Sequence, residues 1–191
     1  MTTKKPLPAS CNSKIQEKIL SSPVGNILVT LCEEGLHSVG LEGDISDENF
    51  SPNESEVIQW VDEDNPAQTK VLTDCLSWFQ AYFKDPALID TVPRPEICCL
   101  RKSELGFRAR VWQTLADTVG PGKVITYGAL AARLENPGAV RAVGSAMRNN
   151  PVGIIVPCHR VVRSSGMGLY HGGKRQTMKK WLLRHEGVDK F

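Results

Sequence analysis

Hydrophobic residues in the first part of the chain follow the pattern of a small antiparallel sheet. The apolar stretches 27–31 and 36–41 flank residues 32–35, Cys-Glu-Glu-Gly, which have the composition of a hairpin turn. An apolar pair at 19–20, ahead of a Ser-Ser-Pro-Val-Gly break, predicts a strand before them. Residues 42–65 are acidic and poor in apolar groups, so we expect a surface loop. The pattern predicts a meander followed by a loop.

After this loop the apolar spacing becomes that of a helix. Asn65-Pro66 predicts the helix start, with Asn as the cap and Pro in the first turn. Apolar positions then recur at three and four residues as far as the predicted stop at Asp85-Pro86, and we expect them to form core. Residues 91–95, Thr-Val-Pro-Arg-Pro, predict a stiff extended linker. We therefore expect two domains, 1–98 and 99–191.

The second part of the chain has a mostly helical pattern. Four helices are predicted: one begins at about Phe107 and ends at the Val-Gly-Pro-Gly break at 119–122, and the others span residues 127–134, about 137–148 and about 175–186. Thr126 is the expected cap of the second helix and Asn136 of the third. These two short helices and the tight turn between them fit a helix-turn-helix, although any small helical domain contains such pairs. The fold class expected is α/β plus α: a small antiparallel sheet with a helix, then a helical domain.

The net charge has opposite signs in these two parts of the chain. Residues 1–98 contain 7 Lys and Arg against 16 Asp and Glu, whereas residues 99–191 contain 16 against 5. The net charges are −9 and +11, so the basic part attracts a polyanion and the acidic part repels it. Nucleic acid is the expected partner, and chance divergence of the two charges is the alternative.

Composition excludes several classes of protein. The chain has 191 residues, 41% hydrophobic and 23% charged, which is an ordinary globular balance. No apolar run approaches the ~18 residues that cross a bilayer, and no apolar stretch follows the two N-terminal lysines as in a secretory signal. Six scattered cysteines do not form the framework of a disulfide-rich secreted module. We expect a reducing compartment, where a cysteine is a free thiol, a metal ligand or a nucleophile.

Candidate chemistry lies at residues 154–162, Ile-Ile-Val-Pro-Cys-His-Arg-Val-Val, where a Cys-His pair sits inside an apolar run. A thiol near its reference pKa of ~8.5 is mostly protonated at neutral pH, and an imidazole that takes its proton makes it nucleophilic. The other imidazole nitrogen then needs an orienting partner, for which Glu186 is a candidate. The alternative is a buried structural cysteine beside a hydrogen-bonded histidine.

These residues in their context resemble the O6-alkylguanine-DNA alkyltransferases, particularly the animal methylguanine-DNA methyltransferases. The resemblance is dense over about 105–188 and is carried by Val-Ile-Thr-Tyr-Gly at 124–128, Arg-Ala-Val-Gly at 141–144, Met-Arg-Asn-Asn-Pro at 147–151, the 154–162 run, Ser-Ser-Gly at 164–166, Tyr-His-Gly-Gly at 170–173 and Trp-Leu-Leu-Arg-His-Glu-Gly at 181–187. It is looser before residue 105. The resemblance implies a ribonuclease H-like amino-terminal domain and a winged-helix-like carboxy-terminal one.

The resemblance also implies a single-use DNA repair protein. Such a protein binds double-stranded DNA, rotates an O6-alkylguanine out of the stack and moves the alkyl group irreversibly onto its own cysteine. The catalytic positions implied are Cys158 as acceptor, His159 and Glu186 in a Cys–His–water network, Asn150 as its brace and Tyr127 at the guanine leaving group. A thiolate attacks an sp³ carbon well and the thioether does not hydrolyse, so no catalytic cofactor is expected.

The remaining site residues are carried over by position. The DNA-binding residues implied are Lys123, Tyr127, Ala139, Arg141, Arg148 and Ser164, with Arg163 as a further phosphate contact. Arg141 fills the gap left by the flipped base, and the helix at 137–148 enters the minor groove. The substrate pocket residues implied are Gly153, Val161, Ser164 and Tyr170. Gly153 replaces a proline of the relatives, and the 164–170 loop is one residue shorter.

A structural zinc is implied in the amino-terminal domain. The matching ligands are Cys11, Cys32, His37 and Cys98, with Cys99 as the alternative to Cys98, and ordinary reduced cysteines are the competing interpretation. The resemblance further implies a monomer in the nucleus, with the cytoplasm as a second location, and no membrane association. Two rival functions stay open, a DNA-binding damage sensor without transfer activity and a Cys-His thiol hydrolase.

Overall fold

The computed structural model describes residues 15–43, 46–61, 69–101 and 106–191. The chain divides into two compact units, Met1–Arg101 and Lys102–Phe191, whereas the sequence predicts a division after Cys98. No helix in the described ranges is long and apolar enough to cross a membrane.

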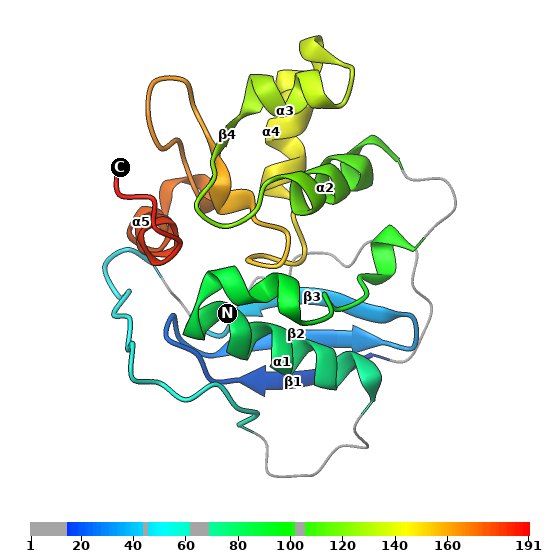
Figure 1. Ribbon diagram of the computed structural model, residues 1–191, viewed down its shortest axis with the longest axis vertical. Helices are drawn as coiled ribbons and strands as arrows, with labels where there is room; N and C mark the ends of the chain where they lie inside the picture. The colour runs from blue at the N-terminus through cyan, green and yellow to red at the C-terminus, as the bar shows by residue number, and fades with distance from the viewer. Residues whose placement is uncertain (1–14, 44–45, 62–68, 102–105) are drawn as a thin grey trace. The chain divides into compact units, whose positions relative to one another are not determined.

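The first unit contains a three-stranded antiparallel sheet in the order β1-β2-β3 (Figure 1). The strands are β1 (Gln16–Leu20), β2 (Ile27–Cys32) and β3 (Gly35–Leu41), so the predicted meander is confirmed. One face carries the apolar positions that are buried in the core: Leu20, Ile27, Val29, Leu31 and Leu36. Residues 46–61 form the predicted loop, apart from a single bridge between Leu20 and Trp60.

The hairpin turn before β3 requires a glycine. Gly35 has φ +135°, and a Cβ atom there would lie 2.5 Å from the Glu96 carbonyl oxygen. This close approach lets the Leu36 N–H donate to that carbonyl at 2.7 Å, and Leu36 pairs in parallel with Ile97. Residues 96–98 are therefore attached to the sheet edge beside β3, which places Cys98 next to the hairpin.

The helix of the first unit begins later than predicted. Helix α1 (Lys70–Lys84) is capped by the Thr69 hydroxyl, which accepts from the Leu72 N–H at 3.4 Å. The predicted start at Asn65-Pro66 lies outside the described ranges, and the described helix begins at Lys70. The predicted stop at Asp85 is confirmed. The buried positions of α1 complete the core of this unit, among them Leu72, Trp78, Phe79 and Tyr82.

The second unit is mostly helical, as predicted. Its elements are α2 (Phe107–Thr118), β4 (Ile125–Thr126), α3 (Tyr127–Arg133), α4 (Val140–Arg148), β5 (Val161–Val162) and α5 (Gln176–His185). Thr126 caps α3 as predicted, since its hydroxyl accepts from the Ala129 N–H at 3.1 Å. Asn136 does not cap α4, because a 3-10 turn at Pro137–Ala139 intervenes and the α4 cap is Ala139.

Two features of this unit bring distant segments together. The Trp112 indole donates to the Ala146 carbonyl at 2.9 Å and joins α2 to α4. Strands β4 and β5 pair in parallel, with Ile125 opposite Val161. Because parallel strands end at the same edge, the residues that follow them, Tyr127 and Arg163, are brought to one side.

Candidate active site

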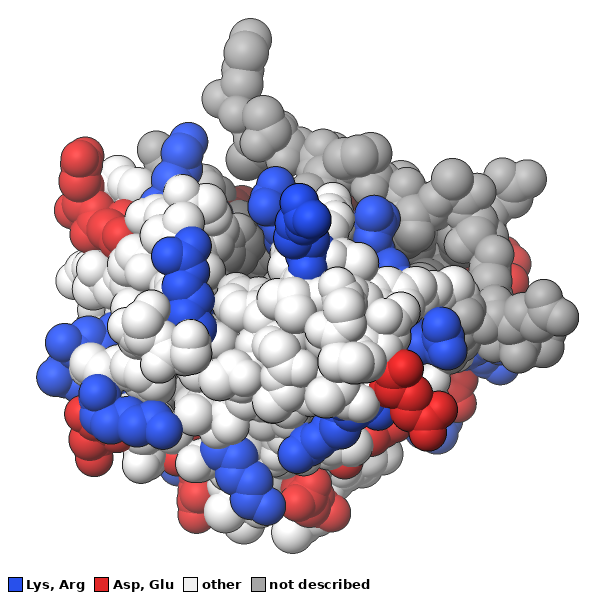
Figure 2. All heavy atoms as spheres, turned by 90° about the horizontal axis from the view of Figure 1, so that it is seen from above, with Lys and Arg blue, Asp and Glu red and all other residues white. Residues whose placement is uncertain are grey.

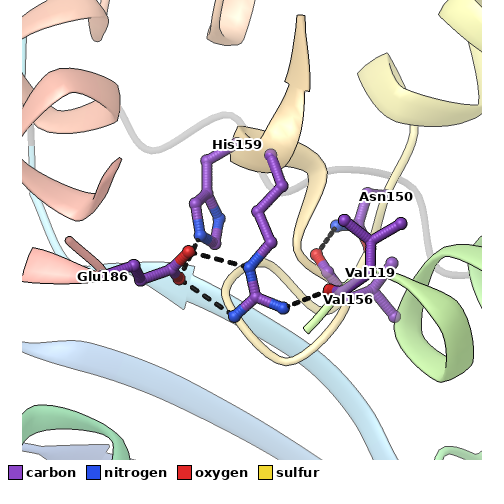
Figure 3. Close-up of polar contacts among 6 residues, drawn as sticks. Val119, Asn150, Val156, His159 and Glu186 are labelled. Atoms are coloured by element: carbon purple, nitrogen blue, oxygen red, sulfur yellow. Dashed lines mark hydrogen bonds and ion pairs between the residues drawn. The ribbon is translucent and has the colours of Figure 1, made fainter. Parts of the chain in front are cut away.

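Cys158 opens a 3-10 turn (Cys158–Arg160) in the second unit and is 7% exposed. The preceding loop is held by Asn150, whose Nδ2 donates to the Val156 carbonyl at 2.8 Å (Figure 3). The Asn150 Oδ1 accepts from the Val152 N–H at 3.1 Å. Both polar ends of this buried amide are used within the loop, so Asn150 fixes the approach of the chain to Cys158.

His159 and Glu186 form a buried pair, and neither side chain is exposed to solvent. His159 Nε2 lies 2.7 Å from Glu186 Oε1 (Figure 3). Burial lowers the pKa of His159 although Glu186 acts to raise it, so the ring is neutral at neutral pH. Nε2 therefore carries the proton that it donates to the carboxylate, and Nδ1 keeps its lone pair. Within the described residues the buried Nδ1 has no hydrogen-bond partner.

Arg160 holds the other side of the Glu186 carboxylate. Its Nε donates to Oε2 at 2.8 Å and its Nη2 to Oε1 at 3.0 Å, while Nη1 donates to the Val119 carbonyl at 2.5 Å. Burial alone would raise the pKa of Glu186, but His159 and Arg160 together lower it to about 2. Because His159 is neutral, the permanently charged Arg160 keeps the carboxylate ionised.

Lys179 is a buried cation that the sequence analysis missed. The residue is 0% exposed, and its Nζ donates to the carbonyls of Val161 at 2.8 Å and Met167 at 2.7 Å. Burial lowers its pKa to about 8, while the nearby Cys158 acts to raise it. Lys179 thus joins α5 to the strand that leaves the Cys158 turn, and to the loop beyond that strand.

Replacing Lys179 with methionine is expected to destabilise the second unit. Methionine fills the space of the aliphatic stem, but the Val161 and Met167 carbonyls lose their donor, at a cost of about 1–3 kcal/mol of unfolding free energy. Urea unfolding followed by tryptophan fluorescence measures the loss. The matched control is Lys180→Met at the neighbouring, half-buried position. Equal losses in the two variants would contradict a role for the buried ammonium.

Two tyrosines border Cys158. Burial and a hydrogen bond with Cys158 raise the pKa of Tyr170 well above its ordinary value. Burial and the neighbouring Cys158 also raise the pKa of Tyr127, against the opposing effect of Arg163 and Arg148. Tyr127 is half-buried, whereas Tyr170 is buried. The structure thus brings these two predicted residues close to Cys158.

The predicted DNA-binding residues lie mainly on the surface of the same unit. Lys123, Arg141, Arg148, Arg163 and Ser164 are exposed, and Ala139 is half-buried. Of the predicted pocket residues, Val161 is buried and Gly153 is half-buried. Figure 2 shows Lys and Arg side chains on a broad uncharged surface, with Asp and Glu side chains mainly towards its margins. Such a surface suits a polyanion.

A possible metal site lies in the first unit. Ligand atoms of Cys32, His37 and Cys98 lie within 4.8 Å of one another, and Cys98 Sγ is 3.4 Å from His37 Nδ1. Cys98, and not the alternative Cys99, belongs to this group among the described residues. The predicted fourth ligand, Cys11, lies outside the described ranges.

Comparison with known proteins matches both units to one family. The model described as 6-O-methylguanine DNA methyltransferase, ribonuclease-like domain, matches residues 15–93, and that described as 6-O-methylguanine DNA methyltransferase, DNA binding domain, matches residues 106–188. A rat protein named methylated-DNA--protein-cysteine methyltransferase is 40% identical over 177 residues, which cover 92% of this chain and 83% of the rat protein. The chain belongs to this methyltransferase family.

Solved structures of the family share the two-part architecture. A crystal structure of Mycobacterium tuberculosis O6-methylguanine methyltransferase is 27% identical with a TM-score of 0.60, and the match covers 91% of this chain and 93% of that one. Mycobacterium tuberculosis OGT in complex with DNA is 26% identical with a TM-score of 0.58, covering 90% and 92%. The predicted ribonuclease-like and DNA-binding domains are therefore confirmed as the fold class.

Within this family site, Arg160 and Lys179 are the residues that sequence reasoning missed. Arg160 lies in the same apolar run as Cys158. A charged residue within an apolar run indicates that its side chain is buried with a partner. Lys179, Leu183 and Glu186 recur at helical spacing, and all three are buried. A charged residue on the apolar face of a predicted helix is therefore the sequence signal that could have identified Lys179 as buried.

Proposed function

We propose that this chain repairs DNA by moving an alkyl group, typically methyl, from O6 of guanine onto Cys158, once per molecule. The observation that carries the proposal is the 2.7 Å contact between His159 Nε2 and Glu186 Oε1. It leaves Nδ1 of the residue next to Cys158 as a buried base. A nucleophile, a base and an orienting group arranged in this way are the parts of an activated thiol.

The proposed alkyl transfer needs no cofactor, because the chain's own residues supply the nucleophile and move the protons. Nδ1 of His159 takes the Cys158 proton through a water molecule, as the family resemblance implies, and the imidazolium formed is stabilised by Glu186. The thiolate then forms a bond to the alkyl carbon while the bond from that carbon to O6 breaks. Tyr127, next to Cys158, gives its proton to the guanine as it leaves, and the proton that His159 took from Cys158 then restores the tyrosine hydroxyl through solvent. The thioether has no hydrolytic exit, so the chain is consumed.

Duplex DNA is the proposed substrate carrier, and its target base must leave the stack to reach a buried thiol. The complex of Mycobacterium tuberculosis OGT with DNA supports this partner. In our proposal α4 enters the minor groove, because the small residues Ala142 and Ser145, three positions apart, make the accessible face of that helix thin. Arg148, Arg163 and Lys123 contact phosphates without regard to sequence, as repair at arbitrary positions requires.

Arg141→Ala is expected to impair base flipping more than DNA binding. The exposed guanidinium is proposed to occupy the space of the flipped guanine, and without it an unstacking cost of a few kcal/mol is unmet. Single-turnover rates should therefore fall roughly 10- to 100-fold on duplex O6-methylguanine and much less on the free modified base. Arg108→Ala, an exposed arginine on α2, is the charge-matched control. Equal slowing of both substrates would exclude the role.

A structural zinc held by Cys32, His37 and Cys98 is also proposed. The three ligand atoms fit one centre, because bonds of ~2.0–2.3 Å in a tetrahedron separate neighbouring ligands by roughly 3.5 Å. Cys11 is the proposed fourth ligand. Zinc would connect the hairpin, the segment after the first domain's helix and the amino terminus, and it would stabilise the domain without taking part in transfer.

Metal removal is expected to lower the melting temperature while Cys158 still accepts a methyl group. Elemental analysis of unchelated protein should give about one zinc per chain. Cys98→Ser is expected to lose the metal, and the adjacent Cys99→Ser, which lies outside the ligand group, to keep it. Well under one zinc per chain, or equal loss from both variants, would remove the site.

Mass spectrometry of the intact protein tests the function directly. After incubation with an O6-methylguanine oligonucleotide, the chain should gain the mass of one methyl group, located on the Cys158 peptide. Unmodified protein that retains bound DNA would favour a damage sensor, and repeated turnover of a thioester would favour a hydrolase. A nuclear monomer remains our proposal for the cellular form, with the cytoplasm as a second location.

A further inference from the structure

The segment between β5 and α5 contains Tyr170, whose hydroxyl is hydrogen-bonded to Cys158 (Figure 1). Residues 167–170 of this segment belong to no helix or strand. The backbone N–H and C=O groups of such a stretch have no neighbouring strand to pair with, so side chains must satisfy them and fix the course of the chain. The position of the Tyr170 hydroxyl therefore depends on the side chains that hold residues 167–170.

Gln176, the first residue of α5, binds this stretch at two points. The Tyr170 N–H donates to Gln176 Oε1 at 2.5 Å, and Gln176 Nε2 donates to the Gly168 carbonyl at 3.0 Å. The acceptor and the donor of one half-buried amide thus meet an N–H and a carbonyl that lie two residues apart in the chain. One side chain defines the path of the backbone from Gly168 to Tyr170.

Lys179 holds the same stretch one residue earlier. Its Nζ donates to the Met167 carbonyl at 2.7 Å. Gln176 and Lys179 are three residues apart, so both project from one face of α5 toward the stretch. Of these two side chains, Gln176 is bonded to Tyr170 itself, and it therefore controls the placement of that residue more directly than Lys179.

The Tyr170 hydroxyl acts as a donor toward Cys158. Burial and the hydrogen bond with Cys158 both raise the pKa of Tyr170 well above its ordinary value, so the phenol keeps its proton at neutral pH. A hydrogen bond raises the pKa of a phenol when the phenol donates it. Because a donated bond to a charged acceptor is stronger than one to a neutral acceptor, this hydroxyl favours the thiolate form of Cys158.

We propose that Gln176 is a positioning residue for the acceptor: it binds the Tyr170 N–H and the Gly168 carbonyl and so keeps the Tyr170 hydroxyl on Cys158, where the hydroxyl stabilises the thiolate. Gln176 acts through Tyr170. The inference rests on the proposed function for the reaction that the thiolate performs, but the supply of the thiolate can be measured without DNA.

Alkylation of the full chain with iodoacetamide, followed by mass spectrometry of the Cys158 peptide, tests the proposal. Gln176→Met fills the space of the amide without its donor and acceptor, so Cys158 should react roughly tenfold more slowly at neutral pH. The rates should converge at high pH, where the thiol ionises without help, and a merely structural loss would not produce this convergence. Thr177→Val, at the next and exposed position, is the control and should react like the unmodified chain.

A double-mutant cycle tests whether Gln176 acts through Tyr170. Tyr170→Phe removes the hydroxyl alone and should slow the reaction at least as much as Gln176→Met. Adding Gln176→Met to Tyr170→Phe should slow it little further, because both changes remove the same hydrogen bond to Cys158. Additive losses, or a rate in Gln176→Met equal to that of the unmodified chain, would overturn the proposal.

Gln176→Glu keeps the proposal falsifiable if circular dichroism shows that Gln176→Met does not fold. The carboxylate still accepts from the Tyr170 N–H and loses only the donor to Gly168, so this variant should react faster than Tyr170→Phe. A rate as low as that of Tyr170→Phe would overturn the proposal. Iodoacetamide requires no DNA, so these outcomes are separate from methyl transfer, which the O6-methylguanine oligonucleotide tests.

Discussion

Cys158→Ala is expected to abolish alkyl transfer completely while DNA binding persists. The substitution removes the only atom proposed to form the new bond, and the exposed cations of the second unit are unchanged. Alanine also fits the buried position, because removing one sulfur from a turn held by Asn150 leaves the flanking hydrogen bonds in place. Mass spectrometry after incubation with O6-methylguanine duplex should show no added methyl group.

A matched control is available within the same chain. Cys75 is buried in α1 of the first unit, where burial raises the pKa of its thiol to about 12. It is therefore protonated at neutral pH and should accept nothing, so Cys75→Ala is expected to transfer like the unmodified chain. A methyl group still acquired by Cys158→Ala would reject Cys158 as the acceptor. Loss of transfer in both variants would point to a folding defect instead.

Local signals in the sequence predicted most elements of the fold. The Thr126 cap and the 32–35 turn are set by neighbouring residues, and both form as expected. Asn136 failed as the cap of α4 because the choice among nearby residues depends on where packing fixes the helix axis. Thr69 serves α1, and a 3-10 turn precedes α4.

The electrostatics of the site were harder to predict. Glu186 was expected to orient His159, and the two residues lie in contact. Arg160 completes this group by reaching a carbonyl 41 residues away, and Lys179 binds two carbonyls in a different part of the chain. A charged side chain is buried only when such partners exist, and one sequence does not show which backbone carbonyls will face it. The choice of Cys98 over Cys99 likewise depends on the pairing of Leu36 with Glu96.

Glu186→Gln is expected to weaken both the fold and the reaction. Arg160 would keep its buried charge without a carboxylate, and breaking such a pair typically costs about 3–5 kcal/mol. The transfer rate should drop within the ~10²–10⁴-fold range of general acid–base help, because the imidazolium of His159 loses its counter-charge.

The pH dependence of unfolding tests whether the ionised form of Glu186 stabilises the fold. Its folded pKa is depressed, so its stabilisation is complete above pH 4.5 and is lost as the pH falls toward 2. Unfolding free energy should therefore decline over that window in the unmodified chain and more gently in Glu186→Gln. Asp189→Asn, an exposed carboxylate three residues along, is the control and should keep the steep decline. If the unfolding free energy of all three proteins declines equally with pH, Glu186 does not stabilise the fold through its charge. If the transfer rate of Glu186→Gln is also unchanged, Glu186 has no role in the reaction. Arg160 and His159 would then be stable without their shared partner.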